Sequence, residues 1–269
     1  MFNLLDIKDR IAEKGPYQNV FLQECEYMNY LLEEVNRSLV ELDQGIRGIL
    51  TMSERMEDLQ TALNMEKIPE TWVKLAYPAK RSLATWLENL MKRIDQLSGW
   101  RDDPMNIPRV TKLNYLFNPQ SFLTAIKQFS KKAELNKLMI ATEFTKKSLE
   151  EIDAAAKDGA YCYGFLLEGA RWDWQIGQCD ECKPKEMFSV MPVCLCRSIA
   201  IKEDTREDKG IYICPVYRTE MRGAANLILH AQLKTPTKNP PRKWVLGGVA
   251  CILDVEGVSD EIKKTDDKK

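Results

Sequence analysis

The chain has 269 residues, with 39 basic and 40 acidic side chains, and 44% of its residues are hydrophobic. That length and apolar content are enough for one large domain or two smaller ones with a packed core. A formal net charge of -1 argues against a general nucleic-acid binder and against a protein held to membranes by charge, because either needs a surplus of Lys and Arg.

Charge is distributed unevenly along the first half of the chain. Residues 1–66 hold 6 basic and 13 acidic side chains, a net charge of -7, whereas residues 67–137 hold 13 and 6, a net charge of +7. Opposite charges of this size suit docking between helices of the chain or contact with complementary protein surfaces. The small total charge is therefore compatible with a protein partner.

The sequence contains neither a membrane-spanning run nor a secretory signal. No apolar run approaches the ~20 residues that a membrane span needs, and the N-terminus reaches charge at Asp6. We therefore expect a reducing compartment, where the eight cysteines remain thiols and most pack as small buried hydrophobes.

The longest periodic pattern predicts an amphipathic helix. Its apolar positions alternate by three and four residues: Cys25, Met28, Leu32, Val35, Leu39, Leu42, Ile46 and Ile49. Such a heptad seam packs either on a second copy, as a coiled-coil dimer, or on another helix of the same chain. We favour the second arrangement, because further amphipathic helices in this half also need partners.

Two more helices are predicted before residue 100. Thr51 and Glu54 have the spacing of a capping box and would begin the first of them. The second carries apolar residues on one face over Leu83–Leu97, with Ser82 as its N-cap.

A further helix is predicted to begin after Asn118, because a capping residue followed by Pro119 is typical of a helix start. Its buried stripe would contain Phe122, Ile126 and Phe129. The group Asn118, Pro119, Gln120 and Phe122 is our first candidate for a structural or interaction role. Capping and core anchoring are favoured over direct contact with a partner.

After about residue 136 the pattern changes to short apolar runs of strand length, over Leu138–Phe144, Ala160–Leu167, Val193–Ile201, Gly210–Tyr217, Ala225–Leu233 and Trp244–Leu253. Six such runs suggest an antiparallel sheet that curls into a small barrel. We therefore predict an α+β chain with a helical subdomain over 1–136, an antiparallel β-barrel-like subdomain over 137–257, and a charged, disordered tail over 258–269.

Catalytic signals are weak. The sequence has no phosphate-binding loop, no dinucleotide fingerprint, no nucleophile elbow and no zinc-protease motif, so we expect no cofactor and no enzyme activity in this segment. His230, the sole histidine, lies mid-strand without a cysteine or serine motif nearby and is expected to be structural.

Four cysteines are weak candidates for a zinc site: Cys179, Cys182, Cys194 and Cys196. The first two have C-x-x-C spacing, which suits zinc. Cys194 and Cys196 are separated by one residue, and a strand would direct both sulfurs to one face without the turn that encloses a metal. Packing of these two thiols on one side of a strand is the favoured interpretation.

Two other groups are candidates for structural or interaction roles: Glu168, Gly169, Arg171, Trp172, Asp173, Arg222 and Gly223. The first five indicate a strand end bent at the glycine, where Arg171 would pair with a carboxylate and fix the bend. Arg222 and Gly223 indicate a turn with a basic rim, for which ordinary solvated loop charge is the favoured interpretation.

Several segments together resemble one known family: Gln23–Asn29, Ser38–Asp43, Leu116–Ala125, Leu167–Asp173, Cys214–Thr219 and Lys243–Ala250. They are similar to the C-terminal region of dynein heavy chains, most closely the axonemal ones, and follow the family's order from about Phe2 to Asp254. The chain departs from that pattern at Cys179–Cys196, where cysteines are not expected.

The resemblance implies a non-catalytic domain. Dynein heavy chains are ATP-driven microtubule motors with a ring of six AAA+ modules, and this region follows the last module. In the family it has a helical part and a small β-barrel, lies against the ring and modulates motility. The implied partners are ring modules of the same heavy chain and, indirectly, microtubules and other dynein subunits. The implied locations are the cytoplasm, the cytoskeleton and the axoneme of cilia or flagella, and ATP is expected only in the parent ring.

A second hypothesis comes from the heptad seam alone. The chain would then be a free-standing adaptor whose long helix recruits a partner, with a zinc-stabilised β subdomain. The dynein hypothesis is favoured, because it accounts for motifs spread along nearly the whole chain.

Overall fold

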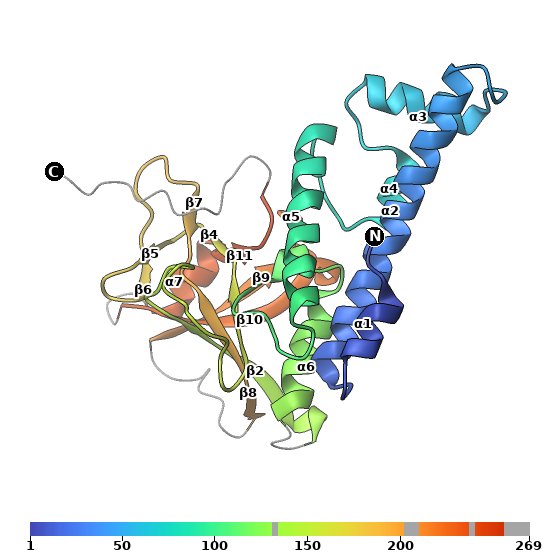
Figure 1. Ribbon diagram of the computed structural model, residues 1–269. Helices are drawn as coiled ribbons and strands as arrows, with labels where there is room; N and C mark the ends of the chain where they lie inside the picture. The colour runs from blue at the N-terminus through green and yellow to red at the C-terminus, as the bar shows by residue number, and fades with distance from the viewer. Residues whose placement is uncertain (131–133, 202–209, 237–239, 256–269) are drawn as a thin grey trace. The chain divides into compact units, whose positions relative to one another are not determined.

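A computed structural model describes residues 1–130, 134–201, 210–236 and 240–255 of the chain (Figure 1). The chain divides into two compact units. The first comprises residues 1–106 and 115–118, and the second comprises residues 107–114 and the chain from Pro119 onward. The backbone therefore passes between the units three times within residues 106–119.

The first unit is helical, with α1 (Leu4–Arg10), α2 (Pro16–Ile46), α3 (Glu54–Asn64), α4 (Glu70–Leu75) and α5 (Leu83–Asp102). The long helix α2 is the one that the heptad seam predicts, and it packs against each of the other four. In Figure 1, α3 follows a turn at the far end of α2. The partners of the seam are thus helices of the same chain.

Burial along α2 is greatest in its first half. Cys25 and Met28 are fully buried, and Leu42 is 6% exposed. Towards the end of the helix, Leu39 is 40% exposed and Ile46 is 63% exposed. The internal helices therefore cover the seam incompletely.

The helix caps confirm one prediction and correct another. The side-chain oxygen of Ser82 caps α5 by accepting a hydrogen bond from the Thr85 N–H. The cap of α3 is Ser53, whose side chain accepts from the Met56 N–H, so the prediction of a capping box at Thr51 is wrong. Glu54 is the first helical residue and cannot occupy the third helical position that a capping box requires.

Aromatic rings and one arginine fill the interior of the helical unit. The Trp86 ring stacks on Trp72 with centroids 5.9 Å apart and on Tyr77 at 6.1 Å. Arg93 is fully buried, and its Nε donates to Asn89 Oδ1 at 2.8 Å. Its Cζ atom lies 3.3 Å from the centroid of the Tyr77 ring, so the guanidinium charge is stabilised by the electron-rich ring face.

The second unit contains the sheets. One sheet has the order β1 (Thr111–Lys112), β3 (Ala160–Tyr163), β8 (Cys194–Ala200), β2 (Leu138–Phe144). The other has the order β10 (Leu227–Lys234), β9 (Ile211–Tyr217), β11 (Ala250–Ile252), β4 (Leu166–Glu168), β7 (Phe188–Val190). A two-stranded hairpin pairs β5 (Arg171–Asp173) with β6 (Gln178–Asp180). The described part of the second unit also contains the α-helices α6 (Pro119–Ser130) and α7 (Pro241–Leu246). Short 3-10 turns lie at Leu113–Tyr115, Leu135–Lys137 and Ala224–Asn226.

The α+β class is confirmed, but the expectation of an antiparallel β-barrel is wrong. Among the described strands the two larger sheets remain open, and β1–β3 and β9–β11 are parallel pairs. Side chains, not a backbone ladder, link the edge strands β2 and β10. The Gln232 N–H donates to Thr142 Oγ1 at 2.8 Å, and the Thr142 N–H donates to Gln232 Oε1 at 3.4 Å. A closed barrel needs ladder pairing at that position.

Most of the predicted strand runs are present with local changes. The run Leu138–Phe144 is strand β2 as predicted. The run Ala160–Leu167 divides at Gly164, whose φ of +87° turns the backbone from one sheet into the other. The run Trp244–Leu253 is wrong in its first part, where Pro240 and Pro241 begin helix α7 and only Ala250–Ile252 is a strand.

Helix α6 (Pro119–Ser130) begins after Asn118, as the proline pattern predicts. It packs on β2 and β8 and belongs to the second unit, although we expected it in a helical subdomain ending at residue 136. Phe122 and Ile126 are buried, whereas Phe129, predicted to be buried, is 56% exposed. The predicted tail, residues 258–269, lies outside the described residues.

None of the helices in the described ranges combines the length and the apolar character needed to cross a bilayer.

Candidate functional site

The end of strand β4 carries the most informative polar contact of the second unit. Arg222, in the turn after β9, forms an ion pair with Glu168 at the end of β4, with Nη2 and Oε2 2.5 Å apart. Its Nη1 donates to the backbone oxygen of Gly248, also at 2.5 Å. We call Glu168, Arg222 and Gly248 the clasp. Along the sequence, Arg222 is 54 residues from Glu168 and 26 residues from Gly248, so the clasp joins three distant segments.

Glycine is required at the clasp for its backbone conformation. Gly169 has a φ of +78° and Gly248 has a φ of +63°. Residues other than glycine rarely adopt this backbone conformation. A Cβ on Gly169 would lie 3.4 Å from the Gly247 oxygen, and one on Gly248 would lie 3.5 Å from Arg222 Nη1. Both distances are ordinary contacts, so the positive φ rather than a lack of room is what favours glycine at these two positions.

A buried tyrosine supports the same turn from inside the unit. The Tyr212 hydroxyl, on β9, donates to the backbone oxygen of Val249 at 2.5 Å. Burial, reinforced by the nearby thiols of Cys214 and Cys251, raises the pKa of Tyr212. The phenol therefore stays protonated and keeps its donor over the ordinary pH range.

The sequence candidates around Glu168 divide into three roles. Trp172 is 3% exposed and packs on Phe144, with ring centroids 5.5 Å apart. Asp173 Oδ1 accepts hydrogen bonds from two backbone N–H groups of the β5–β6 turn, at residues 175 and 176. The carboxylate at the bend, Glu168, pairs with Arg222 rather than with Arg171, so the bend is fixed by an arginine from a different segment than we expected. Gly223 follows in the same turn as Arg222, in an extended conformation with open space around it.

The candidates at the start of α6 have structural contacts elsewhere. Gln120 Nε2 donates to the backbone oxygens of Leu227 and Ile228 on the outer edge of β10. Pro119 and Phe122 are buried. These contacts cover a strand edge that would otherwise present unpaired backbone groups. They agree with the favoured interpretation of core anchoring.

One buried carboxylate was missed by the sequence reasoning. Glu24 on α2 is 1% exposed, and its carboxylate accepts from the N–H groups of Phe117, at 2.5 Å, and Asn118, at 2.8 Å. These contacts hold residues 115–118 within the first unit. The available signal was an acidic residue at helical spacing from Phe21 and Met28 on the apolar face.

The four zinc candidates do not form a single cluster. Cys179 lies on β6 and Cys182 in the following loop, whereas Cys194 and Cys196 lie on β8, where both are fully buried. Within the described ranges, no group of three or more His, Cys, Asp or Glu side chains has an arrangement that suits a metal ion. Burial raises the pKa of Cys179, which disfavours the thiolate that zinc binds.

Comparison with known proteins assigns the chain to a family. The sequence model of the C-terminal domain of dynein heavy chains matches residues 2–253. The chain is 46% identical over 261 residues to the dynein beta chain of the flagellar outer arm of Chlamydomonas reinhardtii, covering 95% of this chain. It is 44% identical to dynein axonemal heavy chain 17 of Mus musculus over 94% of this chain.

The chain spans about 6% of the length of each of these relatives. It is also 43% identical to the ciliary dynein beta chain of Tripneustes gratilla, over 94% of this chain. The resemblance seen in the sequence motifs is thereby confirmed, and the chain belongs to the family of C-terminal domains of dynein heavy chains.

Proposed function

We propose that this chain is the non-catalytic, regulatory C-terminal domain of an axonemal dynein heavy chain. It docks on the AAA+ ring of the same heavy chain and modulates microtubule-based motility, including processivity and force. Its location is then the cytoplasm and cytoskeleton, in the axoneme of a cilium or flagellum, and its other partners, microtubules and further dynein subunits, are reached through the parent motor.

The observation that carries this proposal is the match of residues 2–253 to the C-terminal domain family, together with relatives named as flagellar, ciliary and axonemal dyneins. The matched region is only about 6% of each relative's length, which supports a role as one part of a much longer motor. The absence of nucleotide-binding motifs from the sequence supports a non-catalytic part, with ATP bound only by the ring.

The clasp is the feature best suited to link this domain to motor output. It holds the ends of β4 and β9 and the turn after α7 in one arrangement through an ion pair whose side chains are 37% and 38% exposed. Groups at that depth lie within reach of a docked surface, so a partner can compete for the arginine or pack beside it.

The proposal is tested in two steps. First, the 269-residue chain is added to a dynein heavy chain that ends before this domain, and docking is measured by co-sedimentation. Undetectable docking at micromolar concentration would overturn the ring-docking model. Second, ATP hydrolysis by the 269-residue chain alone is measured, where turnover above background would overturn the non-catalytic assignment.

Motor output then tests regulation. Heavy chains with Arg222→Ala and with the control change Arg242→Ala, at an exposed site of α7, are compared in microtubule gliding. We expect velocity or force to change with Arg222→Ala only. Equal motility of both variants and of a heavy chain lacking the whole domain would contradict a regulatory role.

A further inference from the structure

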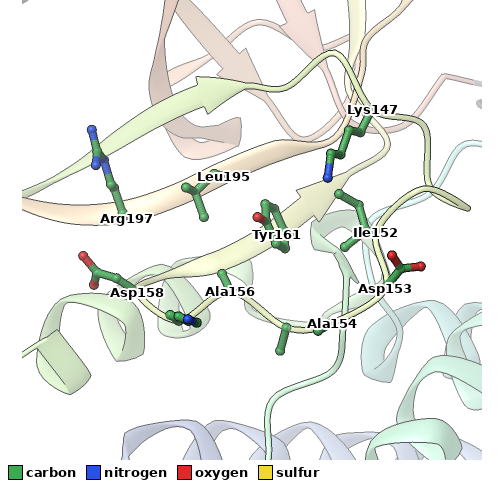
Figure 2. A pocket seen from close by; sticks show the side chains of 11 residues that line it. Lys147, Ile152, Asp153, Ala154, Ala156, Asp158, Tyr161, Leu195 and Arg197 are labelled. Atoms are coloured by element: carbon green, nitrogen blue, oxygen red, sulfur yellow. The ribbon is translucent and has the colours of Figure 1, made fainter.

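A hollow of about 500 Å³ lies on the outer side of the four-stranded sheet in the second unit (Figure 2). The loop over residues 152–158 forms one wall, and residues of β3 and β8 form the other. Figure 2 shows Tyr161 in the middle of the hollow, facing the loop, with the Lys147 side chain extending toward Tyr161 and Ile152. The hollow is separate from the clasp and shares no residue with it.

The chain is anchored within the second unit before and after the loop, so the hollow is held in shape. At one end, the Val193 N–H donates to the Lys147 oxygen at 3.3 Å, and Ile152 is 3% exposed. At the other end, Gly159 has a φ of +85° and lies so close to β8 that a Cβ would overlap the backbone oxygen of Cys196. Leu195 and Arg197 of β8 line the hollow together with the loop.

Two donors in the hollow have no protein partner among the residues that the structure describes. No carboxylate there forms an ion pair with Lys147, and no group there forms a hydrogen bond with the Tyr161 hydroxyl. Arg197, at the rim, has only a long contact of 3.9 Å with Glu143. A cation and a phenol that face a hollow without partners favour a ligand that accepts hydrogen bonds and carries negative charge.

The charge balance of the lining also favours an anion. Three cations border the hollow, at Lys147, Lys157 and Arg197, against two carboxylates, at Asp153 and Asp158. The two carboxylates stand at opposite ends of the loop, on either side of Tyr161 (Figure 2). The lining as a whole therefore carries a small excess of positive charge.

The remaining walls are apolar and small, made by Ala154, Ala155, Ala156 and Leu195 together with the Tyr161 ring. Methyl groups and a ring face suit the methylene stem of a glutamate side chain, whereas a free inorganic anion has no apolar part to place there. We propose that this hollow is a docking site for an acidic segment of a partner protein, with a glutamate carboxylate accepting from Lys147 and Tyr161.

The proposal is independent of ring docking and is tested on the 269-residue chain labelled with ¹⁵N. The probe is an acetylated and amidated pentapeptide with two glutamates between glycines, and the matched control peptide has glutamines instead. We expect the amide signals of residues 147–161 and 195–197 to shift with the glutamate peptide and not with the glutamine peptide. Equal shifts with both peptides, or no shift at millimolar concentration, would overturn the proposal.

Variants identify the donors. Lys147→Met should weaken binding about 10-fold, as expected for loss of one charge-assisted hydrogen bond, and Tyr161→Phe about threefold. The control Lys183→Met, at an exposed lysine outside the hollow, should bind as the unchanged protein does. Amide spectra that coincide away from the hollow establish that each variant is folded. Unchanged affinity of Lys147→Met would overturn the assignment, and inorganic phosphate binding at these residues more tightly than the glutamate peptide would overturn the acidic-segment occupant.

Discussion

At the scale of single residues, Arg222 shows how a single guanidinium group can organise several segments. It bonds a carboxylate on β4 and a backbone oxygen after α7, while it lies in the turn after β9. The guanidinium has several donors in a rigid plane, so it can hold two acceptors that point in different directions. Lysine has the same charge without that planar arrangement.

We therefore expect Arg222→Ala to lower the free energy of unfolding by about 1 kcal/mol, because an exposed ion pair contributes little and the bond to the Gly248 oxygen contributes most of the loss. Arg222→Lys should recover less than half of it. Urea denaturation followed by circular dichroism measures both, with Arg242→Ala as the matched control. A loss for Arg242→Ala as large as that for Arg222→Ala would show that the clasp has no special role.

Arg93 is the residue whose environment departs furthest from the usual one. Its side chain is fully buried, with Tyr77 on one side and Tyr115 at 5.5 Å from Cζ. Its methylene groups also fill space between rings.

Arg93→Ala is expected to destabilise the helical unit by about 2–4 kcal/mol, through a cavity and the loss of cation–π contact. Arg93→Lys should cost less, because it keeps the charge and most of the volume. The control Lys74→Ala removes an exposed lysine of α4, where the ion-pair partner Glu70 is also exposed, and should change stability by less than about 0.5 kcal/mol. Thermal unfolding monitored by tryptophan fluorescence gives the comparison, and a loss below about 1 kcal/mol for Arg93→Ala would contradict this account.

At the scale of elements, glycines determine where strands and helices end. Gly159 combines positive φ with a backbone neighbour that leaves no room for a Cβ, Gly48 has positive φ of +73° with open space, and Gly223 has neither constraint. The three positions therefore separate steric exclusion from backbone conformation.

Substitution by alanine should follow that order. Gly223→Ala is expected to be neutral or slightly stabilising, Gly48→Ala to cost about 1 kcal/mol, and Gly159→Ala to cost more than about 3 kcal/mol because the close pairing of the β3 end with β8 must open. Urea midpoints of the three variants check the series. If Gly159→Ala lowered the urea midpoint no more than Gly48→Ala does, the close approach of Gly159 to β8 would be wrong.

Periodicity predicts the long elements better than the short ones. Helices α2, α5 and α6 and strand β2 follow their apolar spacing because each has several buried positions that repeat. The strands β5, β6 and β7 have three residues each, too few for a period to show. Residues 241–246 have the composition of a strand but form helix α7, which begins at Pro241 and has Gly247 as its C-cap.

At the scale of the whole molecule, the burial of the cysteine side chains shows how well the interior excludes water. Seven of the eight cysteines are buried, and only Cys182 is partly exposed. Burial raises the pKa of Cys25, Cys179 and Cys214 above the ordinary value of 9.0. Since the thiolate is the reactive form, these groups should be inert in the folded protein.

With a thiol reagent at pH 8, we expect about one fast-reacting cysteine per chain, and almost none in Cys182→Ser, whereas unfolding in guanidinium should expose the remainder. Mass spectrometry counts the labels. Rapid labelling of two or more further cysteines in the folded protein would show that the interior is open.

The same raised pKa values predict how the stability of the folded protein changes at alkaline pH. Because the folded-state pKa values are raised, the protonated thiols contribute stability that is complete below pH 9.0 and is lost as the pH rises towards the folded-state values. The urea midpoint should therefore fall above pH 9, and fall less when Cys179 is replaced by alanine. A midpoint independent of pH between about 8 and 10.5 would contradict the shifts.

The sequence by itself determined the family, the long helices and the α+β class, because each depends on patterns that are local or that keep their order along the chain. It also offered Glu168, Gly169 and Arg222 as candidates for a structural or interaction role. Only the tertiary structure decided what that role is, since Arg222 meets a carboxylate 54 residues away and a backbone oxygen 26 residues away. It likewise left the sheets open and separated the zinc candidates, because strand order and pairing depend on contacts between distant segments that no local period encodes.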